Sequence, residues 1–230
     1  MNKFVKAAGA ALLMSIYGGA AAQAEGEWSG NVALTTDYVW RGVTQSAGDW
    51  AIQGGFDYSN GMFYAGTWAS NVDFGDGTDT NMEIDFYGGL AGETDAGLGW
   101  DVGVIYYAYP DSSDTDLDFA EIYGALSYSL SEQFGIGGSV NWDPDNQNTF
   151  VEANAAFAIS DAFSVDAQVG NYSFDGGADY TMYALGASTE FEGFGLDFRF
   201  WSNDIATTGL APASADLLDD RFVITLSRSM

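Results

Sequence analysis

Residues 119–143 read FAEIYGALSYSLSEQFGIGGSVNWD, and this stretch decides the fold. In its first half, Ile122 and Leu126 share one phase of a two-residue period and Glu121 lies in the other, as in a strand with one apolar and one polar face. The short turn SEQ at 131–133 leads into a second segment with the same alternation. We therefore predict two antiparallel strands joined by a minimal turn.

The same period recurs along the chain after residue 24, and no stretch has a convincing helical period. Twelve segments of strand length carry it: residues 28–40, 50–58, 62–74, 81–92, 98–109, 119–130, 134–143, 149–159, 163–174, 180–191, 194–204 and 221–230. Connections after even-numbered segments are minimal. Most connections after odd-numbered segments are longer and acidic, and they hold all three prolines. Short turns at one end and long loops at the other are typical of an outer-membrane barrel.

The predicted fold is all-β, a transmembrane antiparallel up-and-down β-barrel of twelve strands with short periplasmic turns and longer extracellular loops. Aromatic residues such as Tyr58 and Phe63 flank several short turns, where an aromatic girdle at a membrane interface would lie. The alternative is a soluble secreted β-sandwich, but a sandwich has no reason to sort its loops by length and charge. Residues 25–230 are expected to form this single barrel domain.

Residues 1–24 have the pattern of a cleaved secretory signal peptide. Lys3 and Lys6 precede an apolar stretch, and Ala22-Gln23-Ala24 gives a small-residue cleavage site. A membrane-spanning helix would need about 20 apolar residues, and two adjacent glycines argue against it. We expect export to the bacterial outer membrane. The expected partners are the barrel-assembly machinery, outer-membrane lipid and lipopolysaccharide.

The chain of 230 residues is at once strongly acidic and rich in aromatic residues. Its formal net charge is −27, and 16% of its residues are aromatic; removal of residues 1–24 leaves 33 acidic and four basic residues, a net charge of −29. Nucleic acid is excluded as a partner, because phosphate binding needs Lys and Arg. The lack of His and Cys excludes the usual triads, disulfides, thiol chemistry and common zinc and copper sites. We expect no enzyme, catalytic residue, metal or cofactor, and a barrel enzyme using a carboxylate pair is the weaker alternative.

Three stretches resemble the TorF family of proteobacterial outer-membrane porin-like proteins, which is also described as Gcw_chp. They are residues 35–46 (TTDYVWRGVTQS), 66–74 (GTWASNVDF) and 83–89 (EIDFYGG). The resemblance extends over essentially the whole chain after residue 24. It implies an outer-membrane barrel with a pore-like role and brings no catalytic residues to this sequence.

If the apolar phase faces lipid, the opposite phase lines the lumen. Three arginines on neighbouring strands would then share one wall, with two aspartates close by, and face an acidic wall. The predicted pore-lining residues are Arg41, Arg199, Arg221, Asp37 and Asp197 on the first side, and Glu83, Asp85, Asp101, Glu121, Glu152 and Asp166 in the acidic set. Such walls would create a transverse field and favour cations. A shift of phase by one residue, which the pattern leaves open in segments 28–40, 62–74 and 180–191, would reverse the faces.

We therefore expect a porin-like channel for passive diffusion of small polar solutes and ions, with a preference for cations. Charges in a narrow barrel can also pair into a plug. That alternative is a non-conducting structural or adhesion barrel that acts through its acidic extracellular loops. Residues 73–79 and 111–118 have Asp spacing loosely like that of calcium loops but lack the full pattern. Solvated loops are the simpler interpretation, and weak divalent-cation contact with lipopolysaccharide phosphates is the alternative.

Overall fold

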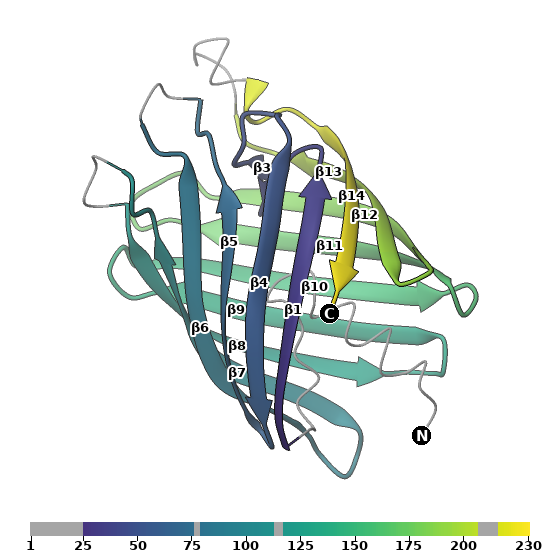
Figure 1. The fold of residues 1–230 in the computed structure, drawn as a ribbon. Coiled ribbons are helices and arrows are strands. Elements are labelled where there is room, and N and C mark those ends of the chain that lie inside the picture. The colour runs from purple at the N-terminus through teal and green to yellow at the C-terminus, as the bar shows by residue number, and fades with distance from the viewer. Residues whose placement is uncertain (1–24, 76–78, 113–116, 207–215) are drawn as a thin grey trace.

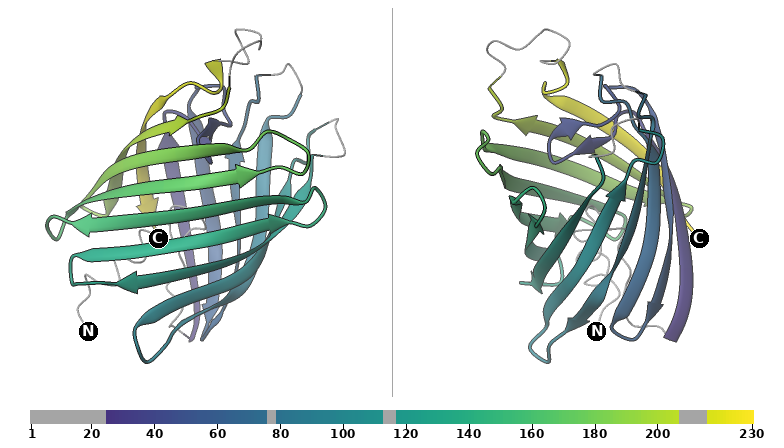
Figure 2. Two further views of the ribbon diagram at one scale, coloured as in Figure 1. Left: turned by 180° about the vertical axis from the view of Figure 1, so that it is seen from behind. Right: turned by 90° about the vertical axis from the view of Figure 1, so that its left-hand side faces the viewer.

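Twelve strands close into a single barrel in a computed structural model of the protein, which describes residues 25–75, 79–112, 117–206 and 216–230 (Figures 1 and 2). Each strand pairs antiparallel with its neighbours in chain order, and the first strand closes on the last. The predicted twelve-stranded antiparallel barrel is confirmed. The signal peptide predicted for residues 1–24 lies outside the described residues.

The barrel strands agree closely with the period-two segments of the sequence. They are β1 (Glu25–Thr35), β4 (Ala51–Asn60), β5 (Phe63–Asn71), β6 (Met82–Glu93), β7 (Leu98–Ala108), β8 (Phe119–Ser129), β9 (Phe134–Asp143), β10 (Asn148–Ala158), β11 (Phe163–Ser173), β12 (Tyr180–Phe191), β13 (Phe194–Asn203) and β14 (Arg221–Ser229). Two very short strands, β2 (Val39–Trp40) and β3 (Val43–Thr44), form a separate hairpin. No helix in the described part of the chain is long and apolar enough to cross a membrane.

The first segment is where the prediction was wrong. A strand was expected over residues 28–40, but the barrel strand ends at Thr35. Thr36 still follows β14: its amide donates to the Ile224 carbonyl at 3.0 Å, and its Oγ1 accepts from the Ile224 amide at 3.0 Å. Beyond Thr36 the chain leaves the barrel wall and forms the β2–β3 hairpin.

The two faces of the wall differ as the alternation predicts. On β8, Glu121 is 1% exposed, whereas Ile122 and Leu126 are 49% and 54% exposed. Large apolar side chains face outward on other strands as well, among them Ile52, Phe56, Val104, Leu185 and Phe222. The inner face carries carboxylates, amides, hydroxyls and tyrosines. An apolar outside and a polar inside is the distribution of a barrel in lipid, and it is the reverse of a soluble β-sandwich.

The seam between β1 and β14 completes the ring. Its register runs from Asn31 opposite Ser229 to Thr35 opposite Thr225. At its far end, Gly30 and Met230 exchange two backbone hydrogen bonds, of 3.1 and 2.8 Å. Closure leaves no unpaired strand edge at this seam, which an apolar surrounding requires because it offers backbone groups no other partner.

The two ends of the barrel differ in the length of their connections. The turn end holds residues 61–62, 94–97, 130–133, 159–162 and 192–193. The loop end holds residues 36–50, 72–81, 109–118, 144–147, 174–179 and 204–220. Within the loop end, residues 76–78, 113–116 and 207–215 lie outside the described residues, so the calcium-like loops are only partly described. Among the described residues, no group of three or more His, Cys, Asp or Glu is arranged to hold a metal ion.

Candidate functional site

The connection 36–50 turns into the barrel near the loop end, and we call it the inserted hairpin (Figure 2). Val39 pairs with Thr44 and Trp40 with Val43. The turn residues Arg41 and Gly42 both have positive φ, 50° and 82°, as a two-residue type I′ turn requires. A Cβ on Gly42 would lie 2.8 Å from the Cβ of Met182 on β12. Glycine therefore lets the tip of the hairpin pack directly on the barrel wall.

Arg41, at this tip, is fixed to the opposite part of the wall. Its Nη1 and Nη2 donate to Oε1 and Oε2 of Glu121 on β8, each at 2.7 Å. The guanidinium carbon lies 4.1 Å from the ring centre of Trp40, 4.4 Å from that of Phe150 and 4.9 Å from that of Tyr172. The positive charge is thus held by a bidentate carboxylate and by three aromatic rings, which are among its strongest partners in a protein.

Glu121 has further donors around it. Asn141 Nδ2 donates to its Oε2 at 3.0 Å, and the Tyr107 hydroxyl donates to the same oxygen at 3.3 Å. A buried carboxylate is tolerated only when charge and hydrogen bonds compensate for lost water. Here β7, β9 and the inserted hairpin together provide that compensation.

Trp40 joins two aromatic clusters of the lumen. Its ring makes edge contacts with Tyr107 at 5.9 Å, Phe119 at 6.5 Å and Tyr172 at 5.9 Å between centroids. The first cluster contains Tyr64, Tyr87, Ile105, Tyr107, Tyr109 and Tyr123, and the second contains Phe150, Tyr172, Tyr180 and Met182. The inserted hairpin therefore narrows the lumen by packing against both sides of it at once.

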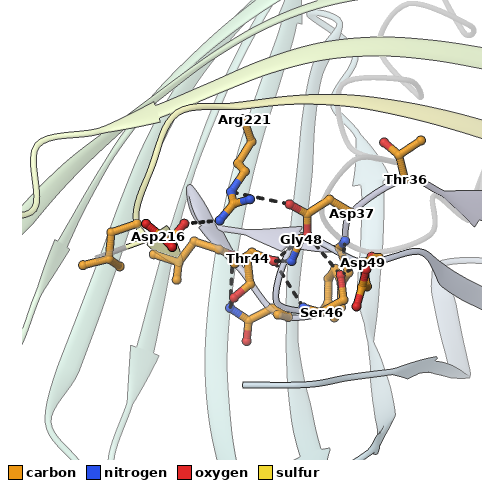
Figure 3. Close-up of polar contacts among 12 residues, drawn as sticks. Thr36, Asp37, Thr44, Ser46, Gly48, Asp49, Asp216 and Arg221 are labelled. Atoms are coloured by element: carbon orange, nitrogen blue, oxygen red, sulfur yellow. Dashed lines mark hydrogen bonds and ion pairs between the residues drawn. The ribbon is translucent and has the colours of Figure 1, made fainter. Parts of the chain in front are cut away.

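The base of the hairpin is held by Asp37 (Figure 3). Its Oδ1 accepts hydrogen bonds from the hydroxyls of Thr44, at 2.5 Å, and Ser46, at 3.0 Å. Its Oδ2 lies 3.6 Å from Nε of Arg221 on β14, and Arg221 also donates to the carbonyl of Asp216. Burial raises the pKa of the Asp37 carboxyl, while the two hydroxyls and Arg221 oppose that rise.

A second polar network lies on β11 and β13. Arg199 donates from Nη1 and Nη2 to the two oxygens of Asp166, at 2.6 and 3.0 Å. It also donates from Nη2 and Nε to Asp197, at 3.0 and 3.2 Å. One guanidinium is thus shared by two carboxylates, so this network has a net negative charge when both are ionised.

A cavity of about 570 Å³ lies at the loop end, bounded on one side by the inserted hairpin. Its lining includes Trp40, Phe119 and Tyr172 together with the carboxylates of Asp143 and Asp179. None of the described residues that line it is basic. The cavity, the inserted hairpin and the charged groups of the lumen together form the candidate site.

A family model described as "Bacterial protein of unknown function (Gcw_chp)" matches residues 19–230. The chain belongs to this family. The Gcw_chp part of the resemblance expected from the sequence is thus confirmed, whereas the TorF name is not part of the description of the matching family. No curated protein sequence matches the chain significantly.

Solved structures share the fold of this Gcw_chp member at low sequence identity. The KdgM porin has a TM-score of 0.62 and 5% identity, over 88% of this chain and 99% of that chain. The NanC porin has a TM-score of 0.58 and 11% identity over the same shares. The COG4313 outer membrane channel from Pseudomonas putida F1 has a TM-score of 0.54 and 12% identity, over 90% and 96%. These likenesses show that the Gcw_chp chain has the outer-membrane barrel fold.

All eleven charged residues predicted to line the lumen of the Gcw_chp barrel are buried or half-buried. The predicted separation into a basic and an acidic wall is wrong. Arg41 lies on the inserted hairpin and not on a wall strand, and it reaches Glu121 in the acidic set. Arg199 pairs with Asp166, also of that set, besides its neighbour Asp197. That these side chains line a conducting path stays a prediction.

Glu83, Asp101 and Glu152 have hydrogen-bond donors in place of a cation. Glu83 accepts from the hydroxyls of Tyr38 and Tyr109, each at 2.8 Å. Asp101 accepts from Tyr64 at 2.6 Å, and Glu152 accepts from Asn154 Nδ2 at 2.9 Å. Asp85 is 6% exposed, and its Oδ1 has no hydrogen-bond partner among the described residues.

Sequence reasoning assigned no role to the inward-facing aromatic residues of this Gcw_chp chain. Tyr87 shares the phase of Glu83 and Asp85, and Tyr123 shares that of Glu121. A tyrosine in the polar phase of a strand was the signal that could have identified these hydroxyl donors. Trp40 carried no such signal, because its position depends on the inserted hairpin.

Proposed function

We propose that the protein is an outer-membrane channel through which small polar solutes and ions diffuse passively, with the inserted hairpin as its constriction. The observation that carries the proposal is a closed twelve-stranded barrel with a charged interior that one inward connection narrows. Barrels of about eight strands are filled by their side chains, whereas those of 16–18 leave a wide channel. Twelve strands with an inserted segment suit a narrow, selective passage.

The proposed orientation follows the sorting of the connections. Long loops of outer-membrane barrels face outward and short turns face the periplasm. The loop end would then lie against lipopolysaccharide, and the exposed apolar band would contact membrane lipid. The proposal includes export by the predicted signal peptide and insertion by the barrel-assembly machinery, as well as the TorF name as a finer family assignment.

We further propose that cations pass more readily than anions. Arg41 and Arg199 are each matched by one or two carboxylates at 2.6–3.0 Å, so they add little free positive potential to the lumen. The Arg199 network holds two carboxylates against one guanidinium, and the loop-end carboxylates Asp179 and Asp204 form no ion pair among the described residues. An excess of carboxylates on a narrow passage attracts cations and repels anions.

A non-conducting structural barrel is the second candidate. The observation in its favour is the bidentate Arg41–Glu121 pair, whose side chains are 6% and 1% exposed and which crosses the lumen. A permanently closed hairpin would plug the barrel, and function would then fall to the acidic loops. An enzyme has less support, because the chain lacks histidine and the fold alone assigns no activity.

Reconstitution in a planar bilayer separates these candidates. The refolded protein should give discrete current steps. In a salt gradient, the reversal potential should have the sign that indicates a cation-selective current. Folding is checked beforehand by heat-dependent gel mobility. An anion-selective current would contradict the cation preference, and a silent bilayer with correctly folded protein would favour the structural barrel.

A further inference from the structure

We propose that the cavity at the loop end is a binding site for a small organic cation of the alkylammonium or quaternary ammonium class. The inference rests on the proposed channel function, since it names the class of solute that would gather at the outer entrance. The cavity has a volume of about 570 Å³, within the range of about 300–1,000 Å³ that is typical of small-ligand sites.

Aromatic rings from separate parts of the chain line the cavity. Trp40 belongs to the inserted hairpin, Phe119 to β8, Tyr172 to β11 and Tyr180 to β12, while Phe174 lies just after β11. Tyr172 packs against Phe174 at 4.3 Å and Tyr180 at 5.8 Å between ring centroids. Rings gathered from several directions around one space are the arrangement that holds quaternary ammonium groups, because each ring face attracts positive charge.

Three carboxylates complete the lining: Asp143, Asp179 and Asp204. Backbone amides hold each of them in place. Asp143 Oδ1 accepts from the amides of Asp145 and Asn146, at 2.9 and 3.0 Å. Asp179 Oδ1 accepts from the Phe174 amide at 3.1 Å, and Asp204 Oδ1 from the Thr181 amide at 2.6 Å.

These carboxylates are fixed by neutral donors and not by a cation. The four ion pairs of the described residues use other carboxylates: Glu121, Asp166, Asp197 and Asp37. The negative charge of Asp143, Asp179 and Asp204 therefore acts on whatever enters the cavity. Arg41, a buried cation beside Trp40, is already bound to Glu121 through both of its terminal nitrogens.

The charge pattern selects among possible ligands. An anion would face three carboxylates and gain no free basic group. A neutral solute would gain contact with the rings but no electrostatic attraction. An organic cation gains both, because its apolar methyl groups contact the rings while its charge is balanced by the carboxylates.

Calorimetry with choline and its neutral carbon isostere, 3,3-dimethylbutan-1-ol, tests the charge requirement directly. The two probes have nearly the same shape, so the difference between them measures the effect of the positive charge. With the refolded barrel in detergent, choline should bind at least tenfold more tightly, and benzenesulfonate should not bind. Equal binding of the two isosteres, tighter binding of the anion, or no binding of choline would overturn the proposal.

The double variant Asp179→Asn/Asp204→Asn identifies the site. Asparagine keeps a side-chain oxygen for the backbone amides and removes the charge, so choline should bind at least tenfold more weakly while the fold is kept. The matched control is Glu132→Gln/Asp161→Asn, which removes two exposed carboxylates at the turn end and should leave binding unchanged. Equal loss in both pairs, or loss in neither, would mean that the cavity is not the site.

The two proposals can fail separately. Choline binding in detergent does not require conduction, so binding together with a silent bilayer would remove the channel function and leave the site. Conduction without choline binding would remove only the site.

Discussion

Arg41 and Glu121, which are 80 residues apart in the chain, form a bidentate ion pair inside the barrel with both distances at 2.7 Å. The pair joins the tip of the inserted hairpin to β8, so it holds the inserted hairpin inside the barrel. The carboxylate and the three aromatic rings around the guanidinium favour arginine at this position, although its φ of 50° is uncommon for a residue with a side chain.

Arg41→Met should release the inserted hairpin. The substitution leaves Glu121 buried without a counter-charge, and breaking a buried pair in this way costs about 3–5 kcal/mol. The expected result is faster limited proteolysis within residues 36–50 and a lower midpoint of unfolding in urea. Arg228→Met, which removes an exposed arginine near the turn end, is the control and should change neither quantity.

Replacing both partners separates the charge from the packing. Arg41→Met/Glu121→Met leaves no unpaired buried charge, so it should recover part of the stability lost in Arg41→Met alone. A double variant as unstable as the sum of the two single variants would mean that the two side chains do not interact in the folded barrel.

Gly42→Ala should destabilise the packing of the hairpin tip on the barrel wall, whereas Gly61→Ala in a turn should not affect the hairpin. Gly42 has φ of +82°, and an added Cβ would lie 2.8 Å from the Cβ of Met182. The control is Gly61→Ala: Gly61 has φ of +61° and no heavy atom within 4 Å of the added Cβ, so it carries only the backbone cost of about 1–2 kcal/mol. Proteolysis within residues 36–50 should accelerate in the first variant only.

Arg199→Gln should increase the preference for cations. It removes the positive charge that lies between Asp166 and Asp197, at 2.6 and 3.0 Å, and leaves two carboxylates at that level of the barrel. The reversal potential in a salt gradient should shift toward that of an ideal cation channel. An unchanged reversal potential in a correctly folded variant would mean that this network does not face the ion path.

Asp37 should make the stability of the folded protein fall as the pH rises through the mildly acidic range. Because burial raises its pKa, the folded form binds more protons than the unfolded form at pH values between the ordinary 3.8 and the raised pKa. Stability should therefore fall as the pH rises through that window. Thermal unfolding of the wild type and Asp37→Asn across mildly acidic pH should show a steeper fall of stability in the wild type, and the same slope in both would assign it to other groups.

The strand pattern could be predicted from sequence because side chains in a barrel wall alternate strictly between lipid and lumen. Ile122 and Glu121 illustrate the rule, and the later eleven segments match barrel strands with ends shifted by at most three residues. The connections alternate between short and long, which indicated an up-and-down barrel. With an even number of strands the first and last strands run antiparallel, so they can pair and close the barrel.

The inserted hairpin could not be predicted in this way. Residues 36–44 include apolar side chains and a dipeptide, Arg41-Gly42, that is not among the usual type I′ turn pairs. The contact that decides its position, Arg41 with Glu121, is between residues far apart in sequence. The pairing of the other arginines depended on register in the same way, so the predicted walls failed. All eleven predicted residues lie buried or half-buried, but the buried carboxylates Asp57 and Asp143 were not among them.

Single-channel conductance of the wild type and Arg41→Met tests the central claim most directly. If the inserted hairpin is the constriction of an open channel, the wild type conducts in small discrete steps and Arg41→Met conducts in larger ones, because the released hairpin no longer narrows the lumen. Equal conductance in both would contradict the constriction. No current from either, with both shown to be folded by heat-dependent gel mobility, would contradict the channel itself.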